Sequence, residues 1–164
     1  MGSEMCIRDS HTKEPVHITY QDLYDRVNTF AAILKSKNIK KGDRVCFYMG
    51  MVPELLVGVL ACTRIGAVHS VVFGGFSATS LAGRLNDCKA KLLVTNDGAY
   101  RGAKTIQLKS VADEALNEAA CVETMIVVQR TNDQVKMKEG RDFWWHDLKK
   151  EFNSYVVEAE SMDS

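Results

Sequence analysis

The chain has 164 residues, 46% of them hydrophobic, which is enough for roughly one domain with its own core. Its 21 basic and 21 acidic side chains balance, so we expect no broad surface for nucleic acid or for an anionic membrane. The five cysteines lack CxxC spacing and no apolar stretch reaches the roughly 20 residues of a membrane span, so we expect a soluble, cytoplasmic protein with free thiols and no metal site.

The N-terminal segment does not fit the pattern that follows it. Residues 1–10, MGSEMCIRDS, have neither the apolar region of a signal peptide nor the periodicity of a helix or strand. We predict that residues 1–15 are a non-family or disordered segment, that residues 16–152 form the domain, and that residues 153–164 are a polar linker without a complete element.

The first regular elements are a short strand over residues 17–19 and a helix over residues 20–37. Thr19 followed three residues later by Asp22 is typical of a capped helix start. The apolar residues of the helix fall at helical spacing and predict a stripe that faces the core: Leu23, Val27, Phe30, Ala31 and Leu34.

Strands and helices then alternate along the chain. We predict strands over residues 44–49, 68–73, 91–96 and 124–129, and helices over residues 53–65, 77–88 and 107–120. Alternation at these lengths predicts an α/β fold with a parallel, doubly wound sheet and flanking helices.

The segment after residue 130 is less regular. We expect a polar surface loop up to residue 140, followed by an aromatic segment in which Trp144 and Trp145 bury apolar area. His146 beside Asp147 could be read as an acid–base pair. We favour a structural role, because neighbours in sequence point in different directions on a helix and no nucleophile is spaced to meet them.

A double-glycine turn follows the strand at residues 68–73. We predict that this strand is buried on both faces, because its residues are β-branched or aromatic: Val68, Val71, Val72 and Phe73. Gly74 and Gly75 would let the backbone approach another group closely. A strand, a glycine turn and a helix start together are typical of nucleotide-binding α/β sheets, although a tight connection without a ligand is the alternative.

A second glycine-containing loop, residues 98–105 (GAYRGAKT), comes within one residue of the P-loop pattern GxxxxGK[ST]. Ala103 stands where the second glycine should be, and no later strand ends in the aspartate that would hold Mg²⁺, so an NTPase is the weaker interpretation. Arg101 and Lys104 could instead form a small cationic clamp for a phosphate. A solvated basic loop remains the alternative.

Three stretches carry a family resemblance. They are residues 18–45, residues 66–104 (GAVHSVVFGGFSATSLAGRLNDCKAKLLVTNDGAYRGAK) and residues 139–148 (EGRDFWWHDL). Together they closely resemble the N-terminal part of the acetyl-CoA synthetase family, which belongs to the adenylate-forming superfamily. The resemblance implies that this α/β sheet is part of a large N-terminal domain closed by a mobile lid.

The resemblance also implies an activity and a set of ligands. Such enzymes join acetate to ATP as an acetyl-adenylate, with Mg²⁺, and then transfer the acetyl group to coenzyme A, so small-molecule substrates are the expected partners. The nucleotide end of coenzyme A would lie against two groups of residues: Phe73, Gly74 and Gly75 in the turn, and Arg101, Gly102, Ala103 and Lys104 in the loop. A glycine is more common in the family at residue 103, which affects the expected affinity for coenzyme A.

The same resemblance implies that the chemistry lies elsewhere. The phosphate loop, the acetate pocket, the Mg²⁺ ligands and the lid lysine would follow residue 164, with residues 153–164 leading toward that loop. We therefore expect no catalytic residue in this chain and no activity from it alone. The alternative class is a non-enzymatic binding module that presents Trp144, Trp145 and the C-terminal segment to a partner.

Overall fold

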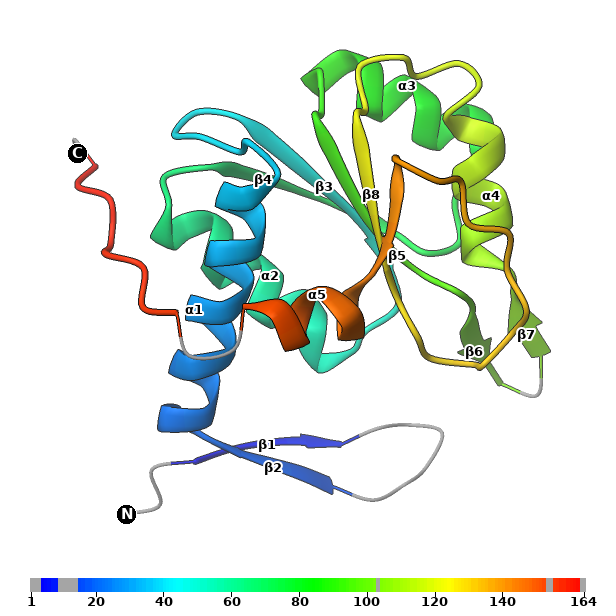
Figure 1. The fold of residues 1–164 in the computed structure, drawn as a ribbon. Coiled ribbons are helices and arrows are strands. Elements are labelled where there is room, and N and C mark those ends of the chain that lie inside the picture. The colour runs from blue at the N-terminus through cyan, green and yellow to red at the C-terminus, as the bar shows by residue number, and fades with distance from the viewer. Residues whose placement is uncertain (1–3, 9–14, 103, 153–154, 163–164) are drawn as a thin grey trace.

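The computed structural model describes residues 4–8, 15–102, 104–152 and 155–162, and its centre is a parallel five-stranded sheet (Figure 1). The strands are β3 (Arg44–Met49), β4 (Val68–Phe73), β5 (Leu92–Asn96), β8 (Thr124–Val128) and β9 (Asp142–Trp144). Their order across the sheet is β4-β3-β5-β8-β9, and every neighbouring pair is parallel. The predicted α/β class with a parallel sheet is confirmed.

Helices cover both faces of the sheet, as a doubly wound fold requires (Figure 1). One face carries α1 (Tyr20–Ser36), α2 (Pro53–Arg64) and α5 (Trp145–Glu151), and the other carries α3 (Ala78–Cys88) and α4 (Leu108–Ala115). Because side chains alternate along a strand, Phe47 of β3 packs in the first core and Tyr48 in the second. No helix among the described residues is long and apolar enough to cross a lipid bilayer.

The N-terminal helix α1 begins as its sequence predicts. The Thr19 hydroxyl accepts a hydrogen bond from the Asp22 backbone N–H at 3.0 Å, and the Asp22 carboxylate accepts one from the Thr19 N–H at 3.2 Å. This reciprocal pair satisfies two backbone donors of the first turn. The predicted apolar stripe is buried except for Leu23, which is partly buried against the same core.

A hairpin precedes α1. It consists of β1 (Glu4–Arg8) and β2 (Pro15–Thr19), which pair in antiparallel fashion. The sequence pattern predicted only the second of these strands.

Strand β4 forms one edge of the sheet, and the prediction that it is buried on both faces is wrong. Of its apolar residues only Val72 is buried, whereas Val68, Val71 and Phe73 are 52%, 50% and 64% exposed. The described strands pair with β4 on one side only, through β3. Its β-branched and aromatic residues indicated a strand, but they carry no information about how many neighbours that strand has.

Three further short strands were not predicted. Residues expected to form an irregular loop contain a hairpin of β6 (Ala99–Arg101) and β7 (Lys104–Ile106), which is a sheet of its own. The aromatic segment contributes β9, parallel to β8. Three residues are too few to show a strand period in the sequence.

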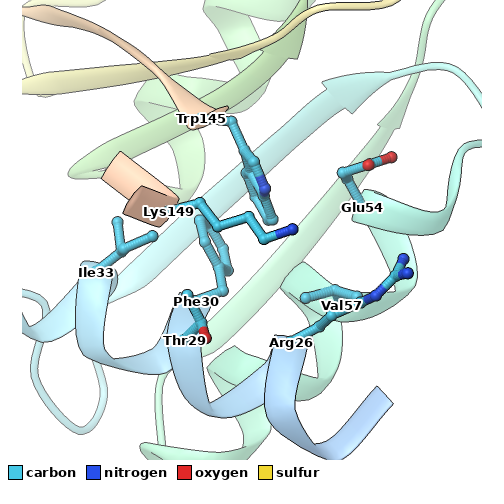
Figure 2. Close-up of a pocket in the computed structure, with 8 residues that line it drawn as sticks. All are labelled: Arg26, Thr29, Phe30, Ile33, Glu54, Val57, Trp145 and Lys149. Atoms are coloured by element: carbon cyan, nitrogen blue, oxygen red, sulfur yellow. The ribbon is translucent and has the colours of Figure 1, made fainter. Parts of the chain in front are cut away.

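The two adjacent tryptophans pack on opposite sides of the sheet, which confirms their structural role. Trp145 stacks on Phe30 of α1 with ring centroids 3.9 Å apart, and Trp144 packs against the second core. Next to the stacked pair, a cavity of about 40 Å³ lies between α1, α2 and α5 (Figure 2). This volume suits only a few water molecules, so it is a gap in the packing rather than a ligand site.

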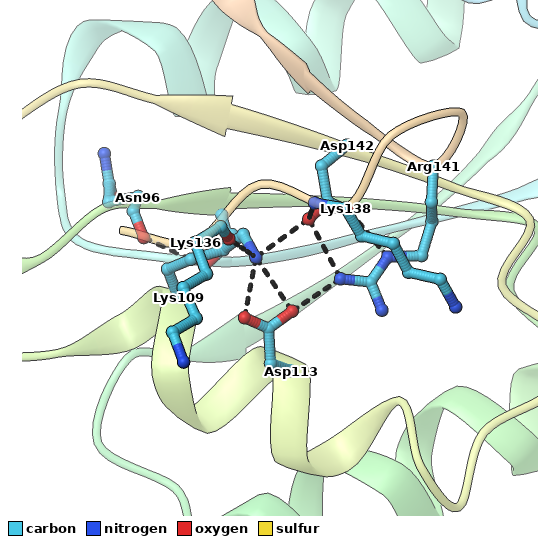
Figure 3. Close-up of polar contacts among 8 residues, drawn as sticks. Asn96, Lys109, Asp113, Lys136, Lys138, Arg141 and Asp142 are labelled. Atoms are coloured by element: carbon cyan, nitrogen blue, oxygen red, sulfur yellow. Dashed lines mark hydrogen bonds and ion pairs between the residues drawn. The ribbon is translucent and has the colours of Figure 1, made fainter. Parts of the chain in front are cut away.

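Ion pairs join the start of β9 and the residue before it to α4 (Figure 3). The Lys109 ammonium, on a side chain 1% exposed, lies 2.7 Å from Asp113 and 2.9 Å from Asp142, and Arg141 pairs with both carboxylates. Burial raises the pKa of Asp142, but hydrogen bonds from Arg141, the Lys138 backbone and Lys109 outweigh burial and hold this pKa below its ordinary value. Two cations and two carboxylates therefore compensate one another.

The described C-terminal residues, 155–162, form no regular element, as predicted, yet they are tied to the helices. The side-chain oxygen of Asn28 in α1 accepts a hydrogen bond from the Val157 N–H at 3.0 Å. Arg64 of α2 donates to the Val157 carbonyl at 2.6 Å, and Lys41 donates to the Ser161 carbonyl at 2.6 Å. This segment therefore follows the outer side of the α1–α2 layer.

Candidate functional site

A cavity of about 420 Å³ opens at the carboxyl edge of the parallel sheet. The chain passes from β3 to β4 on one side and then to β5 on the other side of β3, so the strand order reverses here. Open α/β sheets bind ligands at such a reversal. The ends of four strands contribute to the lining: Gly50 and Met51 after β3, Val71, Val72, Phe73 and Gly74 in and after β4, Asn96 in β5, and Arg130 after β8.

The glycine turn contacts two neighbours at this cavity. A Cβ atom on Gly74 would lie 3.2 Å from the Met49 carbonyl oxygen, and one on Gly75 would lie 2.8 Å from the Phe73 ring and 3.6 Å from Arg101 Nη1. Neither glycine has a positive φ. Their role is therefore to provide space, because the backbone of the turn lies close to the Met49 carbonyl and to the Phe73 ring.

A buried hydroxyl anchors the end of this turn. Tyr48 of β3 donates a hydrogen bond to the Phe76 carbonyl at 2.8 Å, and burial raises the pKa of Tyr48, which keeps this donor protonated. Ser77 then caps α3 by accepting a hydrogen bond from the Ser80 N–H at 3.3 Å. The turn is thus fixed to β3 at one end and to α3 at the other.

The β6–β7 hairpin carries the predicted cationic residues. Arg101 and Lys104 are directly opposite each other, and Gly102, with a φ of 61°, lies in the turn between them. Arg101 lines the cavity, whereas Lys104 is exposed and is not among the described lining residues. Ala103 lies outside the described residues. The structure therefore brings Arg101 together with the glycine turn and leaves Lys104 at the hairpin tip.

This hairpin is incompatible with a P-loop. In a P-loop, the Lys-[Ser/Thr] pair opens a helix whose first amides face the phosphates. Here Lys104 and Thr105 belong to β7, and α4 starts only at Leu108. The alternative interpretation as an NTPase of this type is wrong.

Two buried polar residues that were not predicted connect the strand ends around the cavity by hydrogen bonds. The Asn96 side chain accepts from the Gly50 N–H at 3.0 Å and donates to the Val128 carbonyl at 3.4 Å, which joins the ends of β3 and β8 across β5. Asp97, fully buried, accepts from the Arg130 N–H at 2.7 Å. A polar Thr-Asn-Asp run at the end of an apolar strand is the sequence signal that could have indicated this scaffold.

A second cation in the lining was also missed. Arg130, the first residue after the predicted strand, lines the cavity, and its guanidinium carbon lies 5.4 Å from the centroid of the Tyr100 ring. Only the fold brings this residue next to the hairpin, so no local pattern marks it.

The lining of the cavity is mainly apolar and cationic. Its described residues combine apolar side chains with two guanidinium groups and include no carboxylate, histidine or cysteine. They could hold an anion beside a flat apolar group, and among them only the Tyr100 phenol could serve as an acid or base. The thiols of Cys46 and Cys62 lie buried elsewhere, and burial raises the pKa of each to about 12.

The family model described as AMP-binding enzyme matches residues 3–162 of this chain. The chain belongs to the AMP-binding enzyme family. Among curated family members, it is 52% identical to the acetyl-coenzyme A synthetase of Rubrobacter xylanophilus, over 90% of this chain and 23% of the relative. It is 56% identical to that of Leptospira biflexa, over 87% of this chain and 23% of the relative.

A solved structure agrees with this placement in the AMP-binding enzyme family. The acetoacetyl-CoA synthetase from Streptomyces lividans superimposes with a TM-score of 0.80 at 26% identity, covering 91% of this chain and 23% of that one. The predicted resemblance to acetyl-CoA synthetases is confirmed. The chain spans about a quarter of the length of the curated relatives it matches.

Proposed function

We propose that this chain supplies one part of the coenzyme A site of an AMP-forming acetate–CoA ligase. In the complete reaction, acetate and ATP give acetyl-adenylate and pyrophosphate, and the thiol of coenzyme A then takes the acetyl group and releases AMP. ATP and Mg²⁺ serve the first step, through residues outside this chain. The similarity to curated acetyl-coenzyme A synthetases supports the reaction class.

The observation that carries the proposal is the meeting of Phe73, Gly74 and Arg101 at one cavity on the carboxyl edge of the sheet. The nucleotide end of coenzyme A has a flat purine and several phosphate groups. An aromatic face, here 64% exposed, suits the purine, and a guanidinium suits a phosphate because its donors match two oxygens at once.

The remaining predicted residues have secondary roles in this proposal. Gly75 leaves room beside Arg101, and Lys104, opposite Arg101 on the hairpin, adds a second positive charge at the exposed side. Gly102 and Ala103 connect the two cations. Because the described lining has no carboxylate, histidine or thiol, the chain alone is expected to catalyse neither step. The proposal places the reaction in the cytoplasm, with small molecules as its partners.

The test is Arg101→Ala in a full-length enzyme that contains this chain. We expect the KM for coenzyme A to rise about tenfold, since a charge-assisted hydrogen bond contributes about that factor or more to affinity. Acetate-dependent ATP–pyrophosphate exchange, which needs no coenzyme A, should stay at the wild-type rate.

The matched control is Lys35→Ala, which removes an exposed cation from α1 and should change neither quantity. Lys104→Ala should raise the KM for coenzyme A by a smaller factor than Arg101→Ala. An unchanged KM in Arg101→Ala, or a loss confined to the exchange reaction, would show that the cavity serves another ligand.

A further inference from the structure

We propose that Arg130 is a positioning residue for the β6–β7 hairpin, and that it holds Tyr100 so that the neighbouring Arg101 faces the cavity. This inference rests on the proposed coenzyme A site. It extends that site to the loop after β8, which lies far from the hairpin in the sequence.

The hairpin needs such support because, in the described part of the chain, it shares no hydrogen-bond ladder with the five-stranded sheet. A two-stranded sheet alone is marginally stable in water. Its outer ends are held, since Ala99 and Ile106 pack against the second core. Toward its tip, Tyr100 is half-buried and Arg101 is exposed, so side-chain contacts must fix this part.

Arg130 is itself placed firmly. Its backbone N–H donates to Asp97 at 2.7 Å, and the Thr131 N–H donates to the same carboxylate at 3.1 Å. Asp97 is fully buried at the end of β5. Two backbone amides that share one buried carboxylate fix the start of this loop, so the Arg130 side chain extends from a rigid point.

From this point the guanidinium lies over the Tyr100 ring, with the carbon 5.4 Å from the ring centroid. A guanidinium over an aromatic face is attracted by the ring quadrupole, and the attraction grows as the pair is removed from water. Both groups line the cavity together with Arg101. Because Tyr100 and Arg101 are adjacent in β6, a contact that fixes the first also fixes the direction of the second.

The structural test uses hydrogen–deuterium exchange in a full-length enzyme without coenzyme A. In Arg130→Ala, amides of residues 99–106 should exchange at least about threefold faster, the factor that loss of a weak cation–π contact supports. Amides of β5 and β8 should be unchanged. Arg130→Lys keeps a cation over the ring and should restore most of the protection, and Lys35→Ala serves as the control.

The functional test separates binding from chemistry. Arg130→Ala should raise the KM for coenzyme A about three- to fivefold and leave ATP–pyrophosphate exchange unchanged. Tyr100→Leu should have a similar effect. The double variant should be no worse than either single variant, because both remove one contact. Additive effects would mean that Arg130 binds coenzyme A directly, which would overturn the positioning role.

The two proposals can fail separately. If Arg101→Ala leaves the KM for coenzyme A unchanged while Arg130→Ala still loosens the hairpin, the coenzyme A site is wrong and the positioning of the hairpin stands. If Arg101→Ala raises that KM while Arg130→Ala changes neither the hydrogen exchange of the hairpin nor the KM for coenzyme A, the positioning role is wrong and the coenzyme A site stands.

Discussion

Gly74 shows how a single residue sets the shape of the cavity. Its backbone packs so closely on the end of β3 that a methyl group would lie 3.2 Å from the Met49 carbonyl oxygen and 3.3 Å from a methyl group of Leu108. The first of these neighbours is backbone and cannot rotate away. The glycine is therefore a steric requirement of the turn.

We predict that Gly74→Ala lowers the free energy of unfolding by about 1–2 kcal/mol, the usual cost of adding a methyl group to packed surroundings. Urea denaturation of this chain measures the change. The matched control is Gly83→Ala in α3, where a Cβ would meet nothing within 4 Å. That variant should be neutral or more stable by up to about 1 kcal/mol, because alanine favours a helix. Equal effects in the two variants would contradict the steric role of Gly74.

Among individual residues, the residue type decided which members of the site could be predicted from the sequence. Paired glycines and a nearby arginine can be recognised as site candidates from the sequence alone. Few other residues let the backbone approach another group so closely or bind a phosphate so well. Asp97 and Arg130 could not be recognised from the sequence. They lie 33 positions apart, and only the fold brings them together. A buried carboxylate and a surface one look alike in a sequence.

Among the elements, α4 and β9 are joined by charges rather than by a ladder. Asp142 is the central carboxylate of this group, with no exposed side-chain surface and partners on Lys109 and Arg141. An unpaired buried charge is costly, so removing one member leaves the others uncompensated.

We predict that Asp142→Asn lowers the free energy of unfolding at pH 7 by about 3 kcal/mol. The folded-state pKa of Asp142 lies below the reference value of 3.8, so its contribution is complete above pH 3.8 and is lost as the pH falls through the folded-state pKa. The difference between wild type and variant should therefore shrink below pH 3.8, as measured by urea denaturation at a series of pH values. Asp147→Asn, whose carboxylate is 56% exposed beside Lys150, should lower the free energy of unfolding far less, because solvent screens this pair. A difference that stayed constant down to pH 2 would contradict the ionised role of Asp142.

For the strands that follow α1, length decided whether the sequence predicted them. The capped helix α1 and the strands β3, β5 and β8 show several periods of their pattern, and all were predicted. The three-residue strands β6, β7 and β9 show less than two periods and depend on tertiary neighbours. The cationic clamp was thus predicted as a loop, although its two members are partners across a hairpin.

At the scale of the whole molecule, the sheet has an open edge. Beyond β4 no described strand continues the ladder, and Val68 and Val71 present apolar side chains there. Exposed strand edges of this kind pair with other chains unless something covers them.

We predict that this chain alone self-associates through β4. Val71→Lys, a change at a side chain 50% exposed, should reduce the association at least about tenfold, because a lysine at an edge opposes strand pairing. Sedimentation velocity over a range of concentrations measures it. Leu60→Lys on α2, also at an exposed apolar side chain, is the control and should leave the association unchanged. Equal reductions in the two variants would indicate nonspecific hydrophobic association instead of pairing at the β4 edge.

The contact between Asn28 and Val157 has a consequence for how the protein is made. The two residues are 129 positions apart, and the Asn28 side chain, 2% exposed, accepts from the Val157 N–H. While the ribosome is still adding residues after α5, the core around α1 and α2 can assemble. The Asn28 amide oxygen cannot form this hydrogen bond until Val157 has been added. Completion of the α1–α2 layer is therefore tied to the last described part of the chain, and a nascent protein that pauses before residue 157 keeps this polar atom without its donor.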